Sequence, residues 1–162
     1  MQFKASIDYG LRAVLFLASK DSTCSSKDIA ETMAIPRDYL IQLAQLLRRK
    51  GIIEARPGKH GGYRLARKPS EISLLDVIGA LEDDAKKPQR AAADKDLPEA
   101  AVRIRSAYET VMTCYDQFMG SISLDMLLKC ARDPSHSKEF IAEQLKAESD
   151  RLGNAVTGTA GR

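Results

Sequence analysis

Apolar residues recur every three or four positions through the first third of the chain, a spacing typical of helices that bury one face. A first helix, over about residues 3–20, is predicted by Phe3, Ile7, Leu11, Val14 and Ala18. Ser25, followed three residues later by Asp28, predicts the capped start of a second helix, which would bury Ile29 and Met33.

A third helix is expected to begin at Pro36, where the missing N–H costs little, and to end at Gly51. One face is apolar and should pack on the first two helices; it carries Leu40, Leu43, Ala44 and Leu47. The opposite face is free to contact a partner, and it carries Arg37, Asp38, Ile41, Gln45 and Arg48, with Gln42 and Arg49 on its flanks.

Two short strands, at residues 52–56 and 63–66, are predicted to form a hairpin around the glycine-rich turn at residues 57–62. A fourth helix begins after Ser73, which is followed three residues on by Asp76, and runs to about Leu81. This order of elements predicts a winged helix-turn-helix over residues 1–83. The expected fold class is therefore mainly α with a small β-hairpin.

The second half of the chain has a different pattern. Residues 84–97 are interpreted as a linker, and residues 132–162 as a C-terminal helix followed by a disordered tail from about Gly153. Between them, residues 98–131 are expected to form a long dimerisation helix and a short following helix. Steps of four and three form a heptad face with Leu97, Ala101, Ile104, Tyr108, Val111, Tyr115, Phe118 and Ile122.

The heptad face has two readings. It could be an ordinary core stripe within one domain. The linker, however, separates it from the winged segment, and too little chain remains to bury it. We therefore expect it to pair with the same helix of a second copy, which predicts a two-fold homodimer.

Basic charge is concentrated in one stretch. Residues 36–68 hold nine Lys and Arg against two acids, a formal charge of +7 in a chain whose total is +3. A surface helix with solvated charge would account for a basic helix end alone. Because a basic hairpin follows at once, the pattern favours duplex DNA, with the third helix in the major groove and the hairpin tip along the phosphates.

The predicted DNA contacts lie on the third helix, at the start of the second helix and in the hairpin. Gln pairs with adenine and Arg with guanine, and Ile41 can meet a thymine methyl group. Glycines let the hairpin backbone approach closely, and Arg56 is the expected minor-groove or phosphate contact. The full set is Ser25, Ser26, Arg37, Asp38, Tyr39, Ile41, Gln42, Gln45, Arg48, Arg49, Arg56, Lys59, His60, Gly61, Gly62 and Tyr63.

Other classes of function find little support. No nucleophile–base set or phosphate loop is recognisable, so no enzyme is expected. No stretch approaches the roughly 18 apolar residues of a membrane span, so we predict a cytoplasmic protein without a membrane partner. The odd cysteine count, from Cys24, Cys114 and Cys130, suits a reducing compartment. Cys24 precedes a helix N-terminus, which lowers a thiol pKa, and is the candidate redox residue.

Four segments resemble the winged-helix regulator family of IscR, NsrR and CymR, over most of residues 1–130. They are residues 9–13 (YGLRA), 36–43 (PRDYLIQL), 47–53 (LRRKGII) and above all 61–66 (GGYRLA). The resemblance implies a bacterial dimeric transcription regulator, in most cases a repressor. It also implies that Tyr39, Gln42 and Arg56 match DNA-contacting positions. An acid holds the place of Ile41 in the iron–sulfur member, so the base preference of Ile41 is not transferred.

The resemblance also bears on cofactors. Sensor members carry three clustered cysteines in the linker, whereas residues 82–105 here contain none. Because iron–sulfur clusters need thiolates, we expect no cluster and no other metal. Asp8 matches a carboxylate ligand of an NsrR-like site and is expected to face solvent or pair with Arg12. The sequence therefore resembles a clusterless member that responds to a regulatory protein or a small effector.

The leading interpretation is a homodimeric, sequence-specific repressor of a stress, redox or sulfur- or iron-related operon, bound to double-stranded DNA. Two alternatives stay open at this point. One is a redox or iron–sulfur sensor regulator, and the other is a protein-docking module regulated by a metabolic enzyme.

Overall fold

The computed structural model describes residues 4–20, 22–58, 61–82 and 98–158 of the 162-residue chain. The predicted fold class, mainly helical with one antiparallel hairpin, is confirmed. In chain order the elements are α1 (Ala5–Ser19), α2 (Ser26–Met33), α3 (Arg37–Arg49), β1 (Ile53–Arg56), β2 (Gly62–Leu65), the short 3₁₀ helix η1 (Pro69–Glu71), α4 (Leu74–Leu81), α5 (Glu99–Ser121), α6 (Leu124–Arg132) and α7 (Pro134–Gly158).

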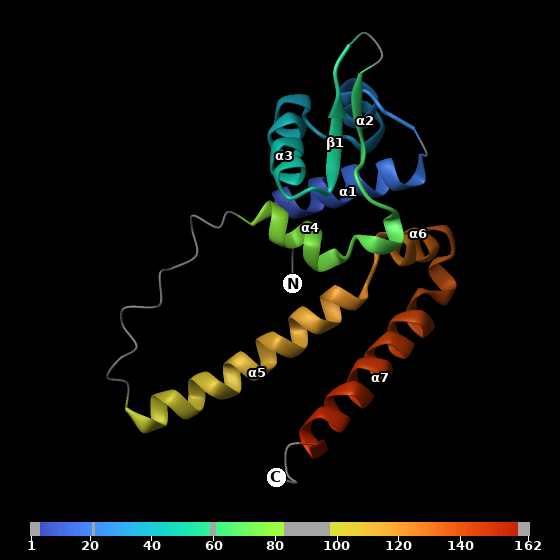
Figure 1. The fold of residues 1–162 in the computed structure, drawn as a ribbon. Helices are drawn as coiled ribbons and strands as arrows, with labels where there is room; N and C mark the ends of the chain where they lie inside the picture. Colours follow the sequence, from blue (N-terminus) through green and yellow to red (C-terminus); the bar gives the residue numbers. More distant parts are fainter. Residues whose placement is uncertain (1–3, 21, 59–60, 83–97, 159–162) are drawn as a thin grey trace.

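One hydrophobic core holds the first four helices and the base of the hairpin, which together we call the winged part. α1 lies in its middle and contacts α2, α3, α4 and α6 (Figure 1). The apolar face predicted for the third helix is confirmed, because Leu40, Leu43 and Leu47 are almost fully buried. Leu124 of α6 is also fully buried, so this helix belongs to the same core. Burial of each such side chain stabilises the fold by roughly 1.5–3 kcal/mol.

The helix ends follow the predicted capping pattern. Ser25 Oγ accepts a hydrogen bond from the Asp28 N–H at 3.1 Å. Ser73 and Asp76 form a reciprocal capping box, with both nitrogen–oxygen distances at 3.0 Å. Gly51 follows α3 with a φ of +67°, a left-handed conformation that glycine adopts without strain.

The hairpin is fastened to the start of α2 by its backbone. β1 pairs antiparallel with β2, and Arg56 lies opposite Gly62. On its other edge, Tyr63 exchanges two hydrogen bonds with Cys24, at 2.8 and 2.9 Å. The two segments can come this close only because residue 62 is glycine. A Cβ at Gly62 would lie 2.0 Å from the Cys24 carbonyl oxygen.

A second backbone pair fastens α6 to the winged part. The Leu74 N–H donates to the Ile122 carbonyl at 2.7 Å, and the Leu124 N–H donates to the Ile72 carbonyl at 2.9 Å. The chain therefore leaves the winged part after α4, and the segment between α5 and α6 returns to pair with the start of α4.

Ile122 corrects one prediction. It is the last residue of the heptad face predicted to pair with a second copy, but it is only 8% exposed and lies in the core of its own chain. The physical reason is that α5 ends at Ser121 and Ile122 is extended, with φ −90° and ψ 108°. The heptad spacing continues in the sequence beyond the residue at which the helix stops. Phe118, one turn earlier, is also half-buried against the core.

α5 and α7 extend away from the winged part and contact each other (Figure 1). α7 is longer than expected, because the predicted tail from Gly153 is helical as far as Gly158. The predicted linker, residues 84–97, and Leu97 of the heptad face lie outside the described residues. The division of the chain into domains stays a prediction.

Candidate nucleic-acid interface

α3 turns one face to the core and the other outward. Ile41 is half-exposed in the middle of the outward face. Six other residues of the predicted DNA contacts on this helix are exposed: Arg37, Asp38, Gln42, Gln45, Arg48 and Arg49. The face therefore combines donors, acceptors and one apolar side chain, which are the groups that distinguish base edges in a major groove.

The starts of α2 and α3 lie side by side. Arg37 Nε donates to Ser26 Oγ at 3.4 Å. Ser25 touches the wing, because a Cβ at Gly62 would lie 2.9 Å from the Ser25 Cα. The structure thus brings together residues that the sequence placed on three separate elements.

The wing presents Arg56 at the end of β1, where it is exposed. The turn after it closes with a hydrogen bond from the Gly61 N–H to the Gly58 carbonyl at 2.9 Å. At Gly61 a Cβ would lie 2.3 Å from the Arg56 carbonyl oxygen, so only glycine fits this turn. Lys59 and His60 lie outside the described residues, and their contacts stay predictions.

Two tyrosines among the predicted DNA contacts are less exposed than expected. Tyr39 is half-buried, and its ring packs edge-to-face on Tyr9, with 5.9 Å between ring centres. It lies two residues from Ile41, about 200° around the helix, so it does not share the outward face. Tyr63 is also half-buried and packs against the core.

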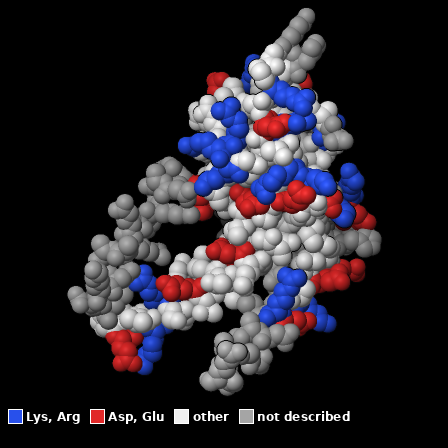
Figure 2. Space-filling view, in the orientation of Figure 1, with Lys and Arg blue, Asp and Glu red and all other residues white. Residues whose placement is uncertain are grey.

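Much of the basic charge is not neutralised by the protein. Figure 2 shows Lys and Arg gathered over the winged part, with some Asp and Glu beside them. Arg64 pairs with Glu54. By contrast, no acidic side chain within the described ranges forms an ion pair with Arg48, Arg49 or Arg56. These three guanidinium groups are therefore available to phosphates.

Cys24 does not have the environment expected of a redox residue. It is only 9% exposed. Burial raises the pKa of its thiol, an effect larger than the opposing one of Lys20, so the reactive thiolate is disfavoured. Its role in the fold is the backbone pair with Tyr63, which sequence reasoning missed. The signal for this pair in the sequence is Gly61-Gly62, because glycine lets the backbone come close to another segment of the protein as well as to DNA.

The described residues do not fit a metal cluster. Cys24 lies before α2, Cys114 on α5 and Cys130 on α6. Among the residues that the structure describes, no three His, Cys, Asp or Glu side chains are grouped so that they could hold a metal ion. Asp8 instead pairs with Arg12, at 2.6 Å between carboxylate and guanidinium, as one of the two expectations had it.

The outer half of α5 exposes the predicted heptad face. Ile104 is 73% exposed, Tyr108 52% and Val111 64%. Val102 and Met112 of the same helix, and Ile141 and Leu145 of α7, are exposed as well. Ala101 and Tyr115 are half-buried. Large exposed apolar faces of this kind mark interaction surfaces.

Within the described ranges, no helix combines the length and apolar character that crossing a membrane requires.

Comparison with known proteins agrees with this geometry. The model of the Rrf2 family, described as iron-dependent transcriptional regulator, matches residues 3–130. BadM of Rhodopseudomonas palustris, named as an HTH-type transcriptional regulator, is 36% identical over 132 residues, which span 80% of this chain and 82% of BadM.

Solved structures of similar sequence are also transcription regulators. T. potens IscR is 30% identical, with a TM-score of 0.65 over 83% of this chain and 91% of that one. CymR of B. subtilis, described as the global cysteine regulator, is 29% identical, with a TM-score of 0.56 over 80% of this chain and 97% of that one. The chain belongs to the Rrf2 family of winged-helix transcription regulators.

Proposed function

We propose that the protein is a homodimeric repressor that binds a specific double-stranded DNA site. In each protomer α3 enters the major groove, and the wing carries Arg56 to the minor groove or the adjacent phosphates. The observation that carries the proposal is the joined exposed surface of α3, the start of α2 and the wing, on which three arginines have no acidic partner among the described residues.

The exposed face of α5 supports the dimer. A 23-residue helix is roughly 35 Å long, which is about one turn of DNA. Pairing of Ile104, Tyr108 and Val111 with the same residues of a second copy would bury apolar surface that one chain leaves in water. The two-fold symmetry of such a dimer would match a palindromic DNA site.

The description of the family refers to iron, but the described residues of this chain do not fit an iron site. The cysteines of this chain lie on separate elements, and the described residues do not group ligands for a metal. A clusterless regulator that responds to a protein or a small molecule fits these residues better. The buried thiol of Cys24 also argues against the redox-sensor alternative.

The direct test is a fluorescence anisotropy titration of DNA from upstream of the protein's own gene. We expect a Kd of about 10 nM or tighter at moderate salt, with affinity that falls steeply as salt rises. Arg56→Ala should weaken binding to all sequences and reduce the salt slope by about one. Ile41→Ala should instead change the preferred base at one position.

The matched control is Lys146→Ala, which removes one charge from an exposed site on α7. It should bind as the unsubstituted protein does. Affinity that does not depend on salt, or equal behaviour of Arg56→Ala and Lys146→Ala, would contradict the proposed interface. In a transcription assay on the same DNA, added protein should lower transcript yield.

A further inference from the structure

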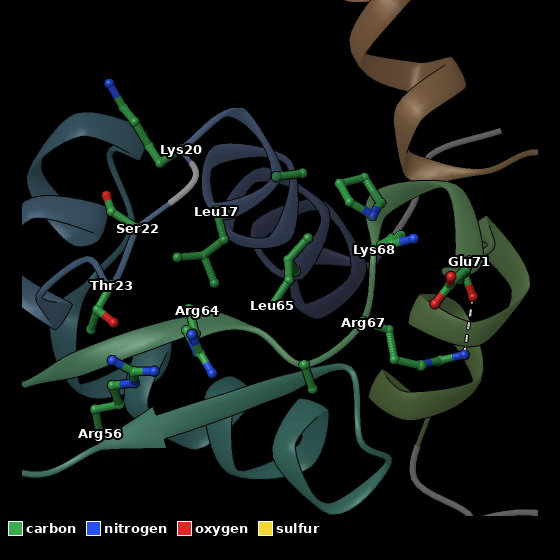
Figure 3. Close-up of a pocket in the computed structure, with 13 residues that line it drawn as sticks. Leu17, Lys20, Ser22, Thr23, Arg56, Arg64, Leu65, Arg67, Lys68 and Glu71 are labelled. Carbon is green, nitrogen blue, oxygen red and sulfur yellow. Dashed lines mark hydrogen bonds between the residues drawn. The ribbon is translucent and has the colours of Figure 1, made fainter.

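A groove of about 810 Å³ lies at the base of the wing, on the side where α1 ends. Four segments line it: the end of α1, the loop before α2, the hairpin and the chain that leads into η1. In Figure 3, Leu17 and Leu65 lie between an end that carries Arg56 and Arg64 and an end that carries Arg67. The groove thus joins an apolar middle to basic ends.

The edge of β2 adds hydrogen-bonding groups to this groove. Hydrogen-bond direction alternates along an antiparallel strand. The Ala66 N–H bonds Ile52 of the hairpin, and Tyr63 bonds Cys24 on the opposite edge. Leu65 follows Tyr63 by two residues, so its N–H and C=O are also directed away from β1, on the side of the groove. No hydrogen bond within the described residues uses them.

The basic side chains of the groove are not equally available. Arg64 is paired with Glu54, and Arg67 lies 3.6 Å from a carboxylate oxygen of Asp76. Arg67 also donates to the Glu71 carbonyl at 3.0 Å.

Arg56, Lys20 and Lys68 are available, because none of them forms an ion pair within the part of the chain that the structure describes. The Lys20 ammonium lies over the Phe16 ring, 5.7 Å from its centre. Glu71 is the acidic residue among those that line the groove.

We propose that this groove binds a small organic anion, with a carboxylate or similar group and an apolar body. Arg56 would hold the anionic group at one end of the groove, and the apolar body would contact Leu17 and Leu65 in the middle, beside the Leu65 N–H. Lys20 and Lys68 would add positive charge along the rim of the groove. The volume lies in the range of natural small-molecule sites, about 300–1,000 Å³. The function of this site rests on the proposed DNA binding: Arg56 cannot serve the anion and the DNA at once, so the ligand lowers DNA affinity.

The site can be tested by NMR titration of the full ¹⁵N-labelled chain with hexanoate. Acetate supplies the charge alone, and hexanol supplies the apolar body alone. We expect hexanoate to shift the amide signals of Leu65, Ala66 and Ser22 at concentrations where acetate and hexanol leave them unchanged. The double variant Lys20→Gln/Lys68→Gln should weaken hexanoate binding about tenfold or more.

Lys146→Gln on α7 is the matched control and should bind hexanoate normally. Three results would overturn the site. They are equal shifts with acetate, shifts confined to α5 and α7, and a double variant that binds hexanoate as well as Lys146→Gln does.

The coupling to DNA is tested separately, by anisotropy at constant ionic strength adjusted with sodium chloride. Saturating hexanoate should raise the Kd for DNA about tenfold in the unsubstituted protein and leave it unchanged in the double variant. Unchanged affinity in a protein that binds DNA would overturn the coupling. Failure to bind DNA without hexanoate would count against the proposed function instead, whereas the NMR result bears on the groove alone.

Discussion

At the scale of single residues, Gly62 makes the attachment of the wing possible. Its missing side chain lets β2 come so close to the start of α2 that Tyr63 and Cys24 exchange two hydrogen bonds. The position of Arg56, which lies opposite Gly62, depends on that attachment.

Gly62→Ala should therefore destabilise the winged part. The added Cβ would meet the backbone of Cys24 and Ser25, which cannot move aside without breaking the pair with Tyr63. We expect the free energy of unfolding to fall by roughly 1–3 kcal/mol, measured by urea denaturation. Gly79→Ala is the control, because it lies in α4 with nothing within 4 Å of its Cβ position. It should raise the free energy of unfolding by up to about 1 kcal/mol, and equal losses in both variants would refute this account.

Cys24 gives a second prediction at this scale. Burial raises the pKa of its thiol, so less thiolate is present at any pH below that raised value. At pH 8, iodoacetamide should modify Cys24 more slowly than Cys130 in the folded protein, as measured by mass spectrometry of peptides. The difference should disappear in urea. Faster modification of Cys24 in the folded state would restore it as a redox candidate.

The burial of Cys24 could not be predicted from the sequence. Its place before α2 was correct, and a helix N-terminus does lower a thiol pKa. Cys24 is also buried, and its backbone pairs with Tyr63 of β2, nearly forty residues away in the chain. Local spacing cannot show that contact.

At the scale of elements, the predictions were most accurate where one face is buried. The face of α3 that carries Leu40, Leu43 and Leu47 could be predicted because helical spacing alone defines it. The caps of α2 and α4 could be predicted because in each a serine side chain accepts from the N–H three residues later, and in α4 the Asp76 carboxylate also accepts from the Ser73 N–H. The end of α5 differs from the prediction, because the apolar spacing continues through Ile122 whereas the helix ends at Ser121.

The capping box of α4 can be tested directly. Ser73→Ala removes the side chain that accepts from the Asp76 N–H, and should lower the free energy of unfolding by about 1 kcal/mol. Urea denaturation followed by circular dichroism would measure the loss. Ser70→Ala, in η1 and exposed, is the matched control and should change the stability little. An unchanged free energy of unfolding in Ser73→Ala would show that the cap is not important for stability.

At the scale of the whole molecule, the apolar face of α5 predicts the oligomeric state. Ile104→Lys places a charge on that face and should shift the protein from dimer to monomer. Light scattering would then give a mass near 17.8 kDa rather than twice that value. Ser106→Lys adds the same charge about 200° around the helix and should leave the dimer intact. A monomer for the unsubstituted protein, or dimers for both variants, would rule out pairing through this face.

The groove at the base of the wing could not have been predicted from the sequence. Its residues come from four segments between Leu17 and Glu71, and no spacing rule connects Lys20 with Lys68. The excess of basic residues over 36–68 did indicate a polyanion-binding surface. It could not indicate which of these basic side chains would form an ion pair in the folded protein. Arg64 does so, with Glu54.

The hydrogen bonds that join Ile122 to Leu74 and Leu124 to Ile72 have a mechanical consequence. They make the near end of α5 move as one body with the core, so the helix acts as an arm of roughly 35 Å. Rotating this arm by only about 5° displaces its far end by roughly 3 Å. In a two-fold assembly, a slight change in the angle at which the two arms cross would therefore alter the distance between the two copies of α3, without unfolding either of them.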